Sequence, residues 1–355
     1  MHFYKKPYLI GETAFHHQGD VNYLFKLIDE GIKAGVDTLK FHLLFDLDDY
    51  FIKDHEAYEV LDNMIIPEND WNEIHSYCLK KGINPIYLCN DVKAIRWVNK
   101  KDKNSVLGIE IHATGINDIF LLEEASKFTS SVFLGTGGST FDEIEFAISY
   151  LKNKGKQNII LMHGFQSYPT NYKDAILSKL SVLRDLYKLP VGYADHTDPK
   201  DEYNSFISTM GVASGFNILE KHFTLDTSKK RIDSQAAVSL DQLKQIRNLM
   251  NVAYEAFSFD RRLDMSDSEK AYGDVGPMKK ALVVAKDLEE GHEIQITDLA
   301  YKRTNNSVPV KQNEIFSFLG EVTNQKIDKD TPINYNLVDY KFKKPDVSQF
   351  FVKEK

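Results

Sequence analysis

The sequence predicts an α/β chain in which a (β/α)8 TIM barrel precedes a small second domain. Eight short apolar runs alternate with amphipathic stretches between residue 8 and about residue 257. Continuous apolar runs of this length are typical of parallel strands that are buried on both faces. A polar segment with two glycines and a proline, 259–280, then separates them from a shorter β-rich stretch. The alternative, an open doubly wound sheet, is disfavoured because no Gly-x-Gly-x-x-Gly follows the first run.

The eight runs predict strands that are short and evenly distributed along the chain. They lie at 8–12, 38–42, 84–88, 108–112, 131–134, 158–163, 190–193 and 217–222. Helices are predicted between them, among others at 20–34, 140–152, 174–187 and 239–257. The first has apolar residues at helical spacing and stops at Gly35, and the second begins with a capping box, Thr140-x-x-Glu143. Eight strand–helix units in about 250 residues match the usual size of a TIM barrel.

The predicted domain organisation follows from these elements. The barrel covers residues 1–258, a linker 259–280, the small domain 281–340 and a charged tail 341–355. The connection between the second strand and its helix, 43–68, is long and is expected on the catalytic face.

Composition excludes some classes of function. The formal charge is 44 − 52 = −8, and an acidic chain without basic clusters argues against nucleic-acid binding. No apolar run approaches the roughly 18 residues of a membrane span. The first residues lack the pattern of a signal sequence, so a cytoplasmic protein is expected.

Ionisable residues end otherwise apolar strands, which would be costly without a functional reason. In a TIM barrel the carboxyl ends of the strands carry the reactive groups. The residues at these ends are Glu12, Lys40, His42, His112, His163, Asp195, His196 and His222. His196 and His222 follow neighbouring strands, a pattern that suits one divalent ion, although a lone histidine is more often a packed core residue. Lys40 could bind a carboxylate, form a Schiff base, or extend along the surface towards water.

Several segments, taken together, resemble the sialic acid synthase family, which includes the legionaminic and pseudaminic acid synthases. They cover nearly the whole chain: LIGETAFHHQGD (9–20), AGVDTLKFH (34–42), GTGGST (135–140), LMHGFQSYPT (161–170), GYADHTD (192–198), ILEKHFTLD (218–226) and ALVVAKDLEEGHEIQITDLAYKR (281–303). The last segment resembles the start of the family's antifreeze-like (SAF, β-clip) domain.

The resemblance implies a reaction and its residues. The family condenses phosphoenolpyruvate with an N-acyl sugar aldehyde, with Mn²⁺ or Mg²⁺ as cofactor. By similarity, His196 and His222 would bind the metal, and Glu12 and Lys40 would be catalytic, Lys40 by holding the donor carboxylate. Substrate contacts would come from His42, His163, Gln166, Tyr168, Asp195, Asp233 and Arg303. Arg303 would reach the site from the antifreeze-like domain of the other subunit in a swapped homodimer.

Departures from the family pattern concentrate at the donor-binding positions. Glu110 and Ala113 stand where the family has Lys and Ser, and Ala194 replaces another Ser. Because phosphoenolpyruvate needs cationic and hydroxyl partners, we expect it to bind poorly or in a different position. Three functions remain open: a phosphoenolpyruvate-dependent synthase, a related carbon–carbon lyase or synthase with another donor, and a non-catalytic ligand-binding homologue.

Overall fold

The structure is a computed structural model that describes residues 6–167, 169–257, 264–273, 278–305 and 310–340. It divides into two compact units, Met1–Asp260 and Arg261–Lys355.

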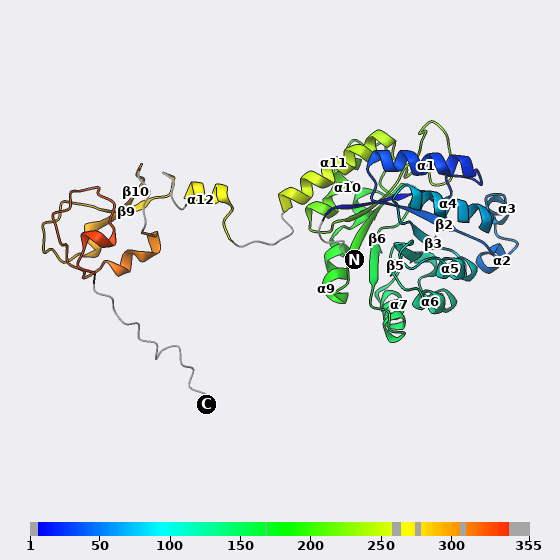
Figure 1. The fold of residues 1–355 in the computed structure, drawn as a ribbon, viewed down its shortest axis with the longest axis horizontal. Helices are drawn as coiled ribbons and strands as arrows, with labels where there is room; N and C mark the ends of the chain where they lie inside the picture. The colour runs from blue at the N-terminus through cyan, green and yellow to red at the C-terminus, as the bar shows by residue number, and fades with distance from the viewer. Residues whose placement is uncertain (1–5, 168, 258–263, 274–277, 306–309, 341–355) are drawn as a thin grey trace, which may run out of the picture. The chain divides into compact units, whose positions relative to one another are not determined.

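The first unit is a closed barrel of eight parallel strands in sequential order, surrounded by helices, which confirms the predicted fold (Figure 1). The strands are β1 (Tyr8–Glu12), β2 (Thr38–Leu43), β3 (Ile86–Cys89), β4 (Gly108–Ile111), β5 (Ser131–Gly135), β6 (Ile159–His163), β7 (Val191–Asp195) and β8 (Ile218–His222). The helices are α1 (Val21–Ala34), α2 (Leu47–Tyr50), α3 (Tyr58–Asp62), α4 (Glu68–Lys80), α5 (Val92–Asn99), α6 (Ile119–Ser126), α7 (Phe141–Asn153), α8 (Tyr172–Ala175), α9 (Ser178–Tyr187), α10 (Asn204–Ala213) and α11 (Leu240–Phe257).

The helix boundaries follow from local sequence. At α1, the Asp20 carboxylate accepts a hydrogen bond from the Tyr23 amide, and Gly35 ends the helix at a φ of 94°. At α7, Thr140 and Glu143 form the predicted capping box. The helix predicted at 174–187 is interrupted, because Ile176 adopts a left-handed conformation between α8 and α9.

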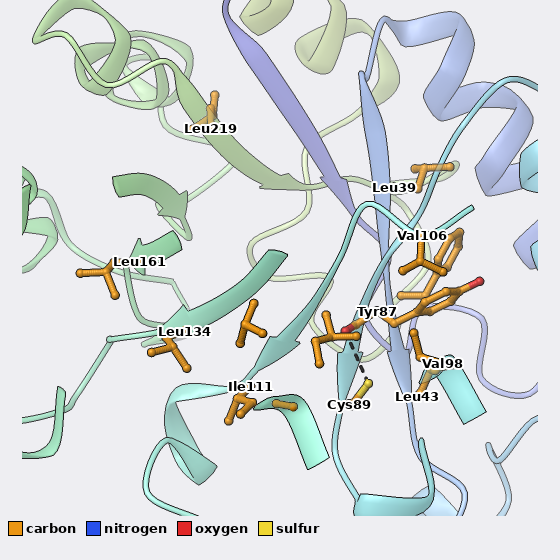
Figure 2. Close-up of a cluster of buried hydrophobic side chains, with 14 of the residues drawn as sticks. Leu39, Leu43, Tyr87, Cys89, Val98, Val106, Ile111, Leu134, Leu161 and Leu219 are labelled. Atoms are coloured by element: carbon orange, nitrogen blue, oxygen red, sulfur yellow. Dashed lines mark hydrogen bonds between the residues drawn. The ribbon is translucent and has the colours of Figure 1, made fainter. Parts of the chain in front are cut away.

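Two apolar layers hold the barrel together. Outward-facing strand residues such as Leu39, Leu134 and Leu219 pack in the cluster between strands and helices (Figure 2). Inward-facing residues, including Ile10, Phe133 and Ile218, form a smaller cluster inside the barrel. Successive strand residues point to opposite faces, so one strand can supply both layers, as β1 does with Leu9 and Ile10. Towards the carboxyl ends of the strands, several inward-facing residues are ionisable, and these residues form the candidate site.

The first and last strands close the barrel. β1 pairs with β8 over five residue pairs, from Tyr8–Ile218 to Glu12–His222. Near this junction the Asp37 carboxylate accepts hydrogen bonds from the Leu9 amide (2.8 Å) and from Arg247 Nη1 on α11 (2.7 Å). The Asp37 carboxylate therefore links the start of β1 to the last helix of the barrel through hydrogen bonds.

The second unit contains a helix, α12 (Asp267–Gly273), and a two-stranded antiparallel sheet of β9 (Ala281–Val284) and β10 (Leu299–Lys302). Leu282, Val284, Ile294 and Phe318 belong to its own apolar core. β9 lies at the start of the predicted small domain, 281–340. The predicted linker, 259–280, includes the helix α12. The predicted tail, 341–355, lies outside the described residues, and within the described part of the chain no helix has the length and apolarity needed to cross a bilayer.

Candidate active site at the mouth of the barrel

A cavity opens at the carboxyl ends of the strands and is lined almost entirely by polar and small residues. Its lining is Glu12, Lys40, His42, Leu88, Glu110, His112, Ala113, Gly135, Met162, Gly164, Gln166, Ala194, His196, Glu220, His222 and Asp233. Strand alternation explains the pairs two residues apart, such as Lys40 with His42 and Glu220 with His222. The barrel therefore places an ionisable layer directly above its apolar interior.

The two histidines predicted as metal ligands meet at this cavity. Their Nε2 atoms lie 3.2 Å apart, and His196 Nδ1 faces the Ala194 carbonyl at 3.1 Å. Burial lowers the pKa of His196 to about 4, against the charges of Glu220 and Asp195. Burial and then the neighbouring His196 lower the pKa of His222 well below its usual value. Both rings are therefore neutral at pH 7, as metal ligands must be.

Three carboxylates surround the amino group of Lys40. Its Nζ lies 2.8 Å from Glu12, 3.0 Å from Glu110 and 2.8 Å from Glu220, and all four side chains are at most 5% exposed. Burial alone lowers the pKa of Lys40, but the charges of Glu110 and Glu220 outweigh it and raise this pKa. Lys40 donates a hydrogen bond to Glu110 and forms ion pairs with Glu12 and Glu220, and we call these four side chains the Lys40 cage.

The remaining histidines of the cavity are neutral as well. His42 Nε2 lies 3.6 Å from Glu12 Oε1, and burial followed by the charge of Lys40 lowers the His42 pKa well below its usual value. The same two causes lower the pKa of His112 to about 4. Glu12 Oε1 also accepts a hydrogen bond from the Ala14 amide at 2.8 Å. Lys40 is thus the cationic side chain among the residues that line the cavity.

On the loops above the strands, Gln166 Nε2 donates to Asp233 Oδ1 at 3.0 Å. Asp233 has a positive φ of 61°, and burial raises the pKa of its carboxyl group. Arg231, two residues earlier, donates to the His16 carbonyl at 2.8 Å and so holds this loop against the one that follows β1. Asp adopts this left-handed conformation more readily than most residues, because its short polar side chain can hydrogen-bond locally.

Some predicted site residues lie elsewhere. The Asp195 carboxylate accepts from Lys221 Nζ (2.7 Å), the Tyr193 hydroxyl (3.0 Å) and the Thr197 amide (2.9 Å), outside the cavity lining. Burial opposes its ionisation, but Lys221 outweighs burial and lowers the Asp195 pKa to about 2. His163 Nε2 bonds the Ala175 carbonyl at 3.0 Å and is also outside the lining. Tyr168 lies outside the described residues.

The remaining predicted residue, Arg303, follows β10 in the second unit, where its guanidinium lies 2.9 Å from Met278 Sδ. Glu220 is the ionisable cavity residue that the sequence prediction missed. Burial raises the pKa of Glu220, against the charge of Lys40. The signal was available, because Glu220 precedes the predicted ligand His222 by two residues on one strand and so shares its face.

The histidine pair fits a bound divalent ion as two adjacent ligands. Within the residues described, no three His, Cys, Asp or Glu side chains are arranged around a common point as a metal site. A bound ion would therefore take its other ligands from water or substrate, which leaves open positions as catalytic metals require. Since Mg²⁺ prefers oxygen donors, two imidazole nitrogens suit Mn²⁺ better.

A closed parallel barrel with ionisable side chains gathered at the carboxyl ends of its strands defines the architecture of a TIM-barrel enzyme. Within that class, the chain belongs to the NeuB family, whose model matches residues 27–259.

Individual relatives agree with this assignment. The chain is 27% identical over 344 residues to the N,N'-diacetyllegionaminic acid synthase of Campylobacter jejuni, a match that covers 92% of this chain and 98% of that protein. It is 27% identical over 323 residues to the uncharacterized protein MJ1065 of Methanocaldococcus jannaschii, covering 91% and 90%. The crystal structure of the N-acetylneuraminic acid synthetase of Leptospira borgpetersenii matches with a TM-score of 0.67 and 28% identity, covering 75% and 90%. The chain is therefore similar over most of its length to sugar-acid synthases.

Proposed function

We propose that this protein is a metal-dependent enzyme that forms a carbon–carbon bond to the aldehyde carbon of a ring-opened N-acyl sugar. The product is a nonulosonic acid, a sugar acid of the sialic acid type, made in the cytoplasm. The observation that carries the proposal is the pair of neutral imidazoles, His196 and His222, beside the Lys40 cage. Relatives that make such acids supply the substrate class.

Each part of the cavity has a role in this proposal. His196 and His222 hold the Mn²⁺ or Mg²⁺ ion, which when bound polarises a carbonyl oxygen. Glu12, fixed by the Ala14 amide, faces the reacting carbons as a base or as a charge that stabilises the transition state. Gln166 and Asp233 contact hydroxyl groups of the sugar. His42 extends this polar surface towards the rim.

The donor has two candidates. The family resemblance favours phosphoenolpyruvate, whose carboxylate would have to compete with Glu12, Glu110 or Glu220 for Lys40. The alternative is a different donor, because Glu110 places a third carboxylate beside Lys40, where a donor with both a carboxylate and a phosphate needs cationic partners. A non-catalytic homologue is disfavoured, because drift would be expected to lose the neutral histidine pair.

The second unit contributes a further part of the proposal. We take residues 281–340 to be an antifreeze-like domain and the working enzyme to be a homodimer in which Arg303 acts at the other subunit's site. A module of about 60 residues has a small core and is more stable when it docks. In the docked position the guanidinium of Arg303 binds the anionic sugar acid.

The test is product formation with manganese and a panel of N-acyl hexosamines, using either phosphoenolpyruvate or pyruvate as donor. The readout is the 2-oxo sugar acid itself, detected by mass spectrometry, with phosphate release measured in parallel. We expect product with at least one acceptor and none after the metal is chelated. Absence of product with both donors across the panel, from protein with one bound metal ion, would reject the proposal.

A further inference from the structure

We infer that Asp195 and Lys221 position the two predicted metal ligands, His196 and His222, from outside the barrel cavity. The inference rests on the proposed function, since it takes these two histidines as ligands of the divalent ion. It is carried by the place of the Asp195–Lys221 ion pair in the strand register, by a turn that Asp195 closes around His196, and by the burial of both charges. Asp195 and Lys221 are positioning residues that act through the backbone of the two ligands.

The backbone pairing of β7 with β8 ends just before the histidine pair. Its last register pair is Asp195 with Lys221. His222, the last residue of β8, pairs with Glu12 on β1, whereas His196 follows the end of β7. In the part of the barrel that the structure describes, the β7–β8 register therefore does not extend to His196. The separation of the two imidazoles depends on the contacts that fix the strand ends beside them.

The ion pair lies at this last register pair, behind the histidines. Lys221 Nζ lies 2.7 Å from Asp195 Oδ2, and both side chains are 0% exposed. Neighbouring strand residues point to opposite faces, so Lys221 points away from the cavity and His222 points into it. A substrate contact through Asp195 is disfavoured, because its carboxylate is outside the cavity lining. The ion pair instead connects the ends of the two strands that present the ligands.

Asp195 also fixes the backbone around His196. Its Oδ1 accepts a hydrogen bond from the Thr197 amide at 2.9 Å, which closes a turn with His196 in the middle. The His196 carbonyl accepts from the Thr170 amide at 2.9 Å. A carbonyl oxygen can only accept, so His196 Nδ1 donates to the Ala194 carbonyl at 3.1 Å and leaves the Nε2 lone pair for a metal ion. The backbone and the ring of His196 are both oriented in this way.

Helix α10 supports the same turn from the outside of the barrel. Asn204 Nδ2 donates to the Thr197 carbonyl at 3.1 Å and to Thr197 Oγ1 at 3.0 Å. The Ser208 hydroxyl is hydrogen-bonded to Asp195 Oδ2, and the Tyr193 hydroxyl donates to Asp195 Oδ1 at 3.0 Å. The Asp195 carboxylate therefore has donors on β7, on β8, in the turn and on α10. These donors hold it in one position, as a residue that orients a neighbouring ligand requires.

Burial of the ion pair separates this role from a contribution to stability. Desolvation of two charges offsets much of their attraction, so apolar residues can often replace a buried ion pair without loss of stability. Apolar residues cannot reproduce the direction of the carboxylate, which joins the Thr197 amide beside one ligand to Lys221 beside the other. Mutation of partners that orient metal ligands typically weakens metal binding about 10–100-fold. We therefore expect the ion pair to affect Mn²⁺ affinity separately from folding.

The test measures Mn²⁺ binding to the full-length protein without any substrate. Free Mn²⁺ is followed by electron paramagnetic resonance during titration of wild type, of Asp195→Asn, and of Asp195→Asn combined with Lys221→Met. We expect the dissociation constant to rise at least tenfold in both variants. The combined variant has no unpaired charge at this position, so its urea midpoint should recover towards wild type while its Mn²⁺ affinity should not. A purely structural ion pair would not produce this difference.

Asp37→Asn is the matched control. Asp37 is also a carboxylate that joins two elements of the barrel, and it accepts hydrogen bonds from the Leu9 amide and from Arg247 near the start of β1. Its replacement removes a comparable contact at the opposite end of the strands from the histidines. The Mn²⁺ dissociation constant of Asp37→Asn should stay within about twofold of wild type, because separate sites act independently.

The outcomes distinguish the inference from the proposed function. If His196→Ala combined with His222→Ala abolishes Mn²⁺ binding, but the folded combined variant of Asp195 and Lys221 keeps the wild-type dissociation constant, the inference is overturned and the ligand assignment stands. Retained Mn²⁺ binding in the histidine double variant overturns both. If the combined variant does not fold, Lys221→Met alone decides by the same criterion, because Asp195 keeps its hydroxyl and amide donors there.

Discussion

Replacing Lys40 with Met tests whether the positive charge of Lys40 stabilises the three buried carboxylates around it. Lys40 is 2% exposed, and Met fills a similar volume without the ammonium group. Glu12, Glu110 and Glu220 would then face one another in a buried space. Removing one partner of a buried ion pair costs about 3–5 kcal/mol, because the other charge stays buried without compensation. We expect a loss of this size in the free energy of unfolding at pH 8.

The loss should depend on pH, with a sign that follows from linkage. Without Lys40, repulsion and burial raise the carboxyl pKa values in the folded state above the roughly 4.3 of an unfolded Glu. The folded variant then holds more protons than the unfolded chain, so its stability falls as pH rises through the raised pKa values. Each extra proton changes the free energy by about 1.4 kcal/mol per pH unit. We expect the loss to shrink to about 1–2 kcal/mol at pH 5.

Urea unfolding followed by tryptophan fluorescence measures this, since the two tryptophans, Trp71 and Trp97, both lie in the barrel. Lys26→Met, an exposed change on α1, is the control and should cost less than about 0.5 kcal/mol. Adding Glu110→Gln to Lys40→Met should recover part of the stability at pH 8. Equal losses at pH 5 and pH 8 would refute the account, because they would show that the carboxylates do not interact at this position.

Three further outcomes are expected. His196→Ala combined with His222→Ala should abolish manganese binding in equilibrium dialysis while circular dichroism stays unchanged; retained metal would contradict the ligand assignment. Asp195→Asn should cost about 3–5 kcal/mol by urea unfolding at pH 5, because it leaves Lys221 buried without its partner, and the loss should not grow at pH 8, because burial without Asp195 lowers the pKa of Lys221 in the folded state; a loss below about 1 kcal/mol at pH 5 would be inconsistent with this. Sedimentation at micromolar concentration should show a dimer, and Arg303→Ala should lower activity at least tenfold without dissociating it; a fully active monomer would count against the shared site.

The eight strands were predictable because each one is an apolar run with few interruptions. Every predicted strand is present within two residues of its expected ends. The break between α8 and α9 was not predictable in the same way. Ile176 has no sequence feature that favours its left-handed conformation, and β-branched residues rarely adopt it.

The sequence predicted some residues of the candidate site correctly and misplaced others. The alternation of side chains along a strand explains the difference. The sequence prediction took the last polar residues of each strand together, so it included both Asp195 and His196. Adjacent strand residues point in opposite directions, and the structure places His196 at the cavity while Asp195 binds Lys221 outside its lining. In the same way, Met162 lines the cavity and its neighbour His163 lies outside the lining. The Lys40 cage depends on side chains from four strands, and such long-range convergence has no local sequence pattern.

The pairing of β1 with β8 has a consequence for synthesis on the ribosome. Glu12, the last residue of β1, is separated from Ile218, the first of β8, by 218 − 12 = 206 positions. At about 5–20 residues per second, the first strand waits roughly 10–40 s before its partner has been translated. Throughout that interval β1 has one open edge, and open edges recruit other chains. A lower growth temperature or added chaperones should therefore increase the yield of folded protein. The increase should be larger than for a protein in which every pair of neighbouring strands is consecutive in sequence.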